Sequence, residues 1–144
     1  MATYNKFLDF SEQLTRGTHL WASNTFKVAL TNTLPVNTNT TWNVTDHPAP
    51  TSASGYTAGG TATTISVAEA AGTTTVQGTQ VVFTAAGGQI GPFRYAVLYN
   101  DTATSPADAS VAWWDYGSSI TLNDGETFTV KFNNTTPGTI FTLT

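Results

Sequence analysis

The stretch AWWDYGSSITLNDGETFTVKF, residues 112–132, decides the fold class. Residues 127–132 alternate strictly between Thr or Lys and a large apolar side chain, which is typical of a half-buried β-strand. The Asn-Asp-Gly triplet at 123–125 supplies residues that accept a positive φ between two alternating runs. We therefore expect a β-hairpin centred on this triplet.

The first half of this stretch places an acid between aromatic residues. A strand through residues 111–116 would direct Val111 and Trp113 to one face and Ala112, Trp114 and Tyr116 to the other. One face must be core, and the other lies under the helix or is available to a partner. Aromatic faces of this kind stack sugar rings in carbohydrate-binding modules, whereas most aromatic pairs on a central strand are simply core.

Asp115, within the same strand, raises the question of catalysis, because flanking rings can raise the pKa of a carboxyl group. The structural interpretation is that Asp115 pairs with Arg94 on a central strand or hydrogen-bonds a turn. We favour this interpretation, since hydrolysis of a sugar needs two facing carboxylates and no second acid is an evident partner.

Working outward from this stretch, further short alternating segments follow one another. Residues 26–31 alternate as a half-buried strand, and residues 93–99 are apolar on both faces, as in a central strand. Gly78 interrupts a third β-rich segment and predicts a bulge or bend. The pattern predicts an all-β fold: a jelly-roll-like antiparallel β-sandwich of about eight strands with one N-terminal α-helix. An immunoglobulin-like sandwich is the main rival topology.

The domain organisation follows from the absence of repeats and linkers. We expect a single domain over residues 1–144, with the helix at 3–16 and the sandwich at 24–144. The helix is indicated by apolar residues spaced three and four apart from Tyr4 to Leu14, with Thr3 as cap and Gly17 as terminator. It would dock on its own sandwich or on a neighbouring subunit.

Residues 32–62 form a long segment rich in Asn, Thr, Pro and Gly, with no strand pattern. Such a loop inside a compact domain is uncommon and usually functional. This one contains Trp42, His47 and Tyr56, which a spacer does not require.

Composition limits the function. Only 10% of the residues are charged and the net charge is −4, with scattered cations, so direct nucleic-acid binding is not expected. No apolar run is long enough for a membrane span, and the first residues lack the pattern of a secretory signal. The low charge and the abundance of Thr indicate either a surface partly covered in an assembly or simply a Thr-rich sandwich.

The inventory of reactive groups is equally limiting. There is no Cys, and the two His residues, His19 and His47, are too few and too isolated for a metal site. No Ser or Thr has an evident His with a third group to orient it. We therefore predict no catalytic residue, no metal site, no cofactor and no enzymatic activity.

The segments FKVALTNTLPV, GYTAGG and GPFRYAVLYNDT, together with residues 112–132, resemble a family of small structural proteins of tailed bacteriophages. The resemblance covers nearly the whole chain and is most specific in its carboxy-terminal motifs. Within that family the chain is most similar to capsid cement, or decoration, proteins. These are jelly-roll-like proteins that sit on the outside of the head and bridge major capsid subunits.

This resemblance implies a virion protein on the outer capsid surface, made in the cytoplasm of the host bacterium. Its partners would be the major capsid protein and itself, with a homodimer favoured over a trimer, and neither nucleic acid nor membrane would be bound. A tail, neck or fibre component and a carbohydrate-binding module remain alternatives. From aromatic content in irregular or two-sided segments, the expected protein-interface residues are Phe7, Phe10, Trp42, Tyr56 and Trp114.

Overall fold

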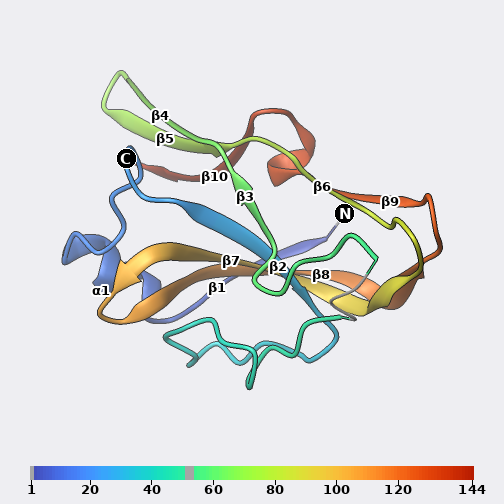
Figure 1. Cartoon of the computed structure of the whole chain (residues 1–144). Coiled ribbons are helices and arrows are strands. Elements are labelled where there is room, and N and C mark those ends of the chain that lie inside the picture. The colour runs from blue at the N-terminus through green and yellow to red at the C-terminus, as the bar shows by residue number, and fades with distance from the viewer. Residues whose placement is uncertain (1, 51–53) are drawn as a thin grey trace.

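The structure is a computed structural model, which describes residues 2–50 and 54–144 and is mostly antiparallel β-sheet (Figure 1). Its described part contains ten strands, one short α-helix and one 3-10 turn. The elements are β1 (Thr3–Lys6), α1 (Phe10–Thr15), β2 (Phe26–Thr31), β3 (Thr61–Thr63), β4 (Ile65–Ala70), β5 (Thr73–Gly78), β6 (Val81–Thr84), β7 (Ile90–Thr104), β8 (Ala107–Leu122), β9 (Thr127–Val130), η1 (Phe132–Asn134) and β10 (Gly138–Leu143).

A five-stranded antiparallel sheet with the order β1-β8-β7-β2-β3 forms one layer. Its centre is the long β7–β8 pair, in which Ala96 lies opposite Trp114 and Val97 opposite Trp113. β2 pairs with the other edge of β7, so β7 has a hydrogen-bonded strand on each side. Residues 95–100 of β7 are all buried, which confirms the prediction of a central strand that is apolar on both faces.

The second layer consists of a three-stranded sheet, β10-β5-β4, and a two-stranded sheet, β6-β9. One buried cluster contains residues of both layers, including Val28 and Leu98 from the first and Val76, Phe83 and Val130 from the second. Side chains of the two layers therefore share one core, as in a β-sandwich. The predicted all-β sandwich is confirmed, with ten strands among the residues described in place of about eight.

The loop between β2 and β3 covers the other face of the five-stranded sheet, and Figure 1 shows it running beneath β7 and β8. Trp42 stacks on Tyr99 with ring centroids 4.7 Å apart and nearly parallel planes. Backbone hydrogen bonds tie the loop to the sheet, from the Trp42 N–H to the Asp108 carbonyl and from the Ser110 N–H to the Thr40 carbonyl. This cover explains why β2 is buried on both faces, and not on one face as its alternation predicted.

The GYTAGG segment, residues 55–60, fixes the end of this loop against β2 and β7. The Tyr56 hydroxyl accepts a hydrogen bond from the Leu30 N–H, and the Tyr99 hydroxyl donates one to the Gly59 carbonyl. Gly60 has a φ of +77°, and a Cβ at this position would overlap the Val28 carbonyl oxygen. Glycine is required here because the backbone approaches β2 too closely for a side chain.

The Asn-Asp-Gly triplet forms a turn, but the predicted hairpin is wrong. Gly125 has a φ of +86°, and the Glu126 N–H donates to the Asn123 carbonyl, as a tight turn requires. However, β9 pairs with β6, while β8 pairs with β7 and β1. The chain crosses from one layer to the other at this turn, because the apolar face of β9 closes the core opposite the five-stranded sheet.

A bulge in β8 alters the predicted alternation of residues 111–116. Leu98 lies opposite Ala112 and Tyr99 opposite Ser110, so Val111 is the extra residue of the pair. Val111 and Ala112 both join the core between the layers, whereas Trp113 faces the loop and packs near Tyr95. The prediction that Val111 and Trp113 share a face is therefore wrong.

The predicted helix at 3–16 is also wrong over its first half. Residues 3–6 form β1, which pairs antiparallel with β8 at the edge of the five-stranded sheet, and only Phe10–Thr15 are helical. The sheet edge satisfies the backbone of this segment, and that long-range pairing overrides the local helical spacing. Phe7 then enters the cluster under the loop, and Phe10 enters the core between the layers. In the part of the chain described, no helix is both long and apolar enough for a membrane span.

Candidate functional site

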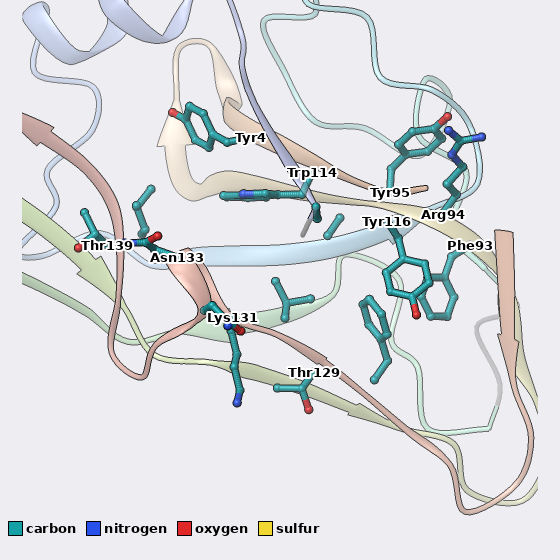
Figure 2. Close-up of a pocket in the computed structure, with 16 residues that line it drawn as sticks. Tyr4, Phe93, Arg94, Tyr95, Trp114, Tyr116, Thr129, Lys131, Asn133 and Thr139 are labelled. Carbon is teal, nitrogen blue, oxygen red and sulfur yellow. The ribbon is translucent and has the colours of Figure 1, made fainter. Parts of the chain in front are cut away.

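A groove of about 540 Å³ opens where the two layers part, between the five-stranded sheet and the segment from β9 to β10. We call it the aromatic groove. Figure 2 shows Trp114 and Tyr116 along one side and Lys131 and Thr129 on the strand opposite. Its lining residues are Ala2, Tyr4, Phe93, Arg94, Tyr95, Ala96, Trp114, Tyr116, Phe128, Thr129, Val130, Lys131, Asn133, Asn134, Thr139 and Ile140.

Strand register brings the aromatic residues of the groove together. Tyr4 of β1 lies directly opposite Trp114 of β8, and their rings meet edge to face with centroids 5.6 Å apart. Tyr116 follows Trp114 by two positions, so it projects from the same side of β8, and its ring meets Phe128 at 5.5 Å. These contacts hold each ring at its edge and leave ring surface toward the groove.

The aromatic rings are accessible in the protomer. Tyr116 is 52% exposed and Tyr4 is 40% exposed, whereas Trp114 is half-buried. The floor beneath them is closed by Phe93, which is 1% exposed and packs against Phe128 at 5.0 Å. The groove thus combines a firm apolar floor with exposed rings at its rim.

Arg94 and Asp115 form a fixed ion pair at one end of the groove. Nε and Nη2 of Arg94 donate to the two carboxylate oxygens of Asp115 at 2.7 and 2.8 Å, and the Gly117 N–H donates to Asp115 Oδ1 at 2.7 Å. The hydrogen bonds from Arg94 hold the pKa of Asp115 below its ordinary value. Asp115 is therefore ionised, and its predicted pairing with Arg94 is confirmed.

The opposite wall of the groove contains apolar residues, such as Phe128 and Val130, and polar ones. Lys131, Asn133 and Asn134 are exposed, and their side chains make no hydrogen bond or ion pair with any other residue that the structure describes. Asn133 and Asn134 both adopt a positive φ, at +47° and +55°, a conformation that Asn tolerates better than most residues.

The charge of the groove differs from that of the whole chain. The lining contains Arg94 and Lys131 but no Asp or Glu, although the net charge of the chain is −4. Arg94 is paired with Asp115, whereas Lys131 lies on the outward face of its strand, has no ion pair among the residues described and points away from Trp114 (Figure 2). The groove therefore offers ring surface together with the side-chain amides of Asn133 and Asn134.

The structure corrects four of the five predicted interface residues. Phe7, Phe10, Trp42 and Tyr56 are all less than 9% exposed, so their side chains pack inside the protomer and do not offer contact surface. Trp42 and Phe7 belong to the cluster between the sheet and the loop, whereas Phe10 and Tyr56 belong to the core between the two layers. Of the five predicted interface residues, only Trp114 lines the aromatic groove.

Within residues 2–50 and 54–144, no group of three or more metal-ligating side chains comes together. His19 is buried among Phe10, Trp21 and Phe26, and His47, a residue of the loop, is buried beside Phe7. Burial lowers the pKa of His19 to about 4 and also lowers that of His47. Both imidazoles are thus neutral core residues at physiological pH.

Several groove residues were not identified from the sequence. Tyr116 could have been predicted to accompany Trp114, because residues two positions apart on a strand project from the same face. Lys131 was assigned correctly to the exposed polar face of its strand, whereas Phe128 on the opposite face meets Tyr116. Tyr4 was placed in a helix, and its position opposite Trp114 depends on pairing between distant segments.

Comparison with protein-family models, with curated proteins and with solved structures gives no match for this chain.

Proposed function

We propose that the protein is a non-enzymatic virion structural protein, a cement protein that binds the outside of a phage head and bridges major capsid subunits. The observation that carries this proposal is the free edge of β4. β4 is the last strand of the sheet β10-β5-β4, and its outer side has no strand partner among the residues described. Figure 1 shows the β4–β5 hairpin reaching away from the sandwich.

The composition of β4 supports pairing with another chain. An exposed strand edge offers a row of free N–H and C=O groups, and proteins usually protect such edges with Lys, Pro or a bulge. β4, with the sequence ISVAEA, carries one charged residue, Glu69, but neither Lys nor Pro, and its pairing with β5 shows no register shift. Five of its six residues are exposed, so an extended segment of a capsid subunit could add to this sheet.

The remainder of the molecule suits a passive scaffold. The described part of the chain shows no cluster of metal-ligating groups, and the one acid beside the groove, Asp115, is neutralised by Arg94. The chain has no Cys and therefore no disulfide, so the two buried cores are what hold the sandwich rigid. A protein that binds the assembled shell and not its separate parts stabilises the shell by mass action, and repeated weak contacts suffice for this.

The test is a charge placed on the edge strand. Val67 of β4 is 44% exposed, so Val67→Lys should leave the fold intact while blocking addition of a strand. Val82 of β6 is 43% exposed in a different sheet and gives a matched control, Val82→Lys. Each purified variant is mixed with heads that were assembled without the protein, and the bound fraction is measured by co-sedimentation.

We expect wild type and Val67→Lys to have the same circular dichroism spectrum and thermal midpoint, but only wild type and Val82→Lys to sediment with heads. Equal attachment of Val67→Lys and wild type would place the shell contact elsewhere on the molecule. Failure of well-folded wild-type protein to bind heads at all would contradict the proposed function.

A further inference from the structure

We propose that His47 makes part of the loop between β2 and β3 a pH-sensitive cover. When the imidazole is protonated, residues 40–50 leave the five-stranded sheet and expose the aromatic cluster beneath them. These residues are called the cover, and Figure 1 shows their loop running beneath β7 and β8. The opening is a property of the isolated protein, so it does not depend on the proposed contact between β4 and the shell.

His47 anchors the part of the cover that follows Trp42. Between residues 43 and 49 it is the one side chain that is buried, and its exposed fraction is 0%. Its ring lies edge to face with the ring of Phe7, with the centroids 6.4 Å apart. The Phe7 N–H donates to the Val111 carbonyl of β8, so His47 connects the loop to the edge of the sheet. Displacement of this ring would release the segment around it.

The imidazole of His47 is buried without hydrogen bonds. Neither Nδ1 nor Nε2 has a partner among the residues described. An imidazolium carries a full charge and two N–H donors, and burying such a group unpaired costs far more than burying the neutral ring. The protonated ring therefore favours water over its place beneath the cover.

Other polar atoms under the cover are also unpaired. The indole Nε1 of Trp42 and the hydroxyl of Ser110 are buried and have no hydrogen-bond partner in the described part of the chain. Ser110 lies opposite Tyr99 in the β7–β8 pair, and Trp42 stacks on Tyr99, so both groups belong to the surface that the loop covers. Hydration of these atoms favours opening, whereas apolar packing opposes it.

The direction of the pH dependence follows from burial. Burial lowers the pKa of His47 in the closed form, and the negative Asp46 and the Asn43 carbonyl offset only part of this effect. In the open form the ring meets water, has its ordinary pKa of 6.5 and so binds the proton first. The closed form is thus fully favoured above about pH 6.5. Below it, the opening equilibrium rises by up to about tenfold for each pH unit.

Other titratable groups lie on the elements that meet the cover. Asp108 of β8 is at its edge, because the Asp108 carbonyl accepts the Trp42 N–H. Burial, and then the charge of Asp101, raises the pKa of Asp108. An acid with a raised pKa is favoured in its buried place by acidification, so Asp108 opposes opening and does not produce it. The remaining groups are Lys6 next to Phe7, Lys27 of β2, and Tyr95, Tyr99 and Asp101 of β7.

The test is hydrogen–deuterium exchange of the full chain at pH 7 and pH 5, measured by mass spectrometry and corrected for the intrinsic pH dependence of exchange. The backbone amides of Trp42 and Ser110 donate the hydrogen bonds that join the cover to β8. We expect both amides to exchange at least about tenfold faster at pH 5 than at pH 7. Amides of β5, in the other layer, report unfolding of the whole sandwich and should accelerate less.

Variants assign the response to one imidazole. His47→Phe keeps a ring beside Phe7 but cannot be protonated, and His47→Leu does the same with a smaller side chain. Both should lose the acceleration at Trp42 and Ser110. His19→Phe, which removes the other buried imidazole, and Asp108→Asn should keep it. An NMR titration of the His47 ring in wild type measures its pKa directly, even if neither His47 variant folds.

Four results would overturn the proposal. These are equal corrected exchange of the Trp42 and Ser110 amides at both pH values, the same acceleration in a folded His47→Phe or His47→Leu protein, an acceleration as large in β5 as in the cover, and a His47 pKa at or above 6.5. Circular dichroism at pH 7 establishes which variants are folded. Because no phage head is present in these measurements, failure of the cover and failure of the shell contact are distinguishable.

Discussion

Arg94 and Asp115 face each other across neighbouring strands and are joined by two hydrogen bonds of 2.7 and 2.8 Å, with the Gly117 N–H donating to the same carboxylate. The pair is half-exposed and lies beside the aromatic groove. Two parallel hydrogen bonds fix both side chains, which a single contact between exposed charges would not do. The pair therefore orients the strand from which Trp114 and Tyr116 project.

This pairing predicts a pH dependence at the acid end. Because the pKa of Asp115 is lowered in the folded state, its stabilising contribution is complete above the ordinary carboxyl pKa of about 4 and is lost as the pH falls through the lower folded value. Asp115→Asn should therefore be less stable than wild type at neutral pH, and the difference should shrink on acidification. Urea denaturation across this pH range measures it.

Arg94→Gln provides the check on that interpretation. The two single variants and the double variant should be non-additive, since each single change already removes the pair. If Asp115→Asn and Arg94→Gln add independently, or if the gap to wild type stays constant with pH, the ion pair does not make the contribution described.

Trp42 should be a stability residue and not a contact residue. It is 8% exposed and stacked on Tyr99, so Trp42→Ala should lower the free energy of unfolding by about 3 kcal/mol or more. Val44→Ala, at a 55% exposed position of the same loop, should change it by less than about 0.5 kcal/mol. A Trp42→Ala protein with wild-type stability would mean that the loop does not pack on the sheet as described.

The burial of His19 should give the stability of the protein a second pH dependence, at higher pH than that of Asp115. Its folded pKa of about 4 lies below the ordinary 6.5 because burial disfavours the charged ring. The unfolded chain therefore binds the proton first, so stability is complete above pH 6.5 and declines as the pH falls toward about 4. The total loss is about 3 kcal/mol.

His19→Phe removes this titration while keeping an aromatic ring near Phe10 and Trp21. His47 also has a lowered pKa, so both proteins will retain some slope. The informative quantity is the difference in unfolding free energy between wild type and His19→Phe at each pH. A difference that does not vary between neutral pH and pH 4 would show that His19 is not buried in its neutral form.

Adding one methyl group at Gly60 should lower the free energy of unfolding by a large amount. A Cβ at this position would overlap the Val28 carbonyl oxygen, and the φ of +77° is unfavourable for alanine. Gly60→Ala should cost about 3 kcal/mol or more, since overpacking and backbone strain act together. Gly72→Ala has a similar φ, of +83°, but no atom within 4 Å, so it reports the backbone strain alone. Equal costs for the two variants, measured by thermal denaturation, would contradict the close approach.

Local periodicity predicted the parts of the fold that depend on local residues. The alternation at 127–132 was correct, with Phe128, Val130 and Phe132 packed in or against the core and the residues between them exposed. Gly78 was recognised as a break, and it ends β5 where a Cβ would strike the ring of Phe132. The strand apolar on both faces was also correct, since its two faces meet two different cores.

Errors arose wherever distant segments decide the outcome. Residues 3–6 have helical spacing but pair with β8, and the turn at 123–125 has hairpin chemistry but sends β9 to β6. The aromatic residues of the loop looked available because no local pattern shows that a loop lies over a sheet. Trp114 was identified from the sequence alone. Tyr4 and Lys131 were not, because only the folded chain brings them to the same groove.

The most direct test of the proposed capsid role is the copy number of this protein in purified virions, measured by quantitative mass spectrometry against the major capsid protein. Our proposal predicts many copies, in a fixed ratio to the major capsid protein that matches positions of the shell lattice. A few copies confined to the portal vertex or tail, or none in the particle, would contradict it.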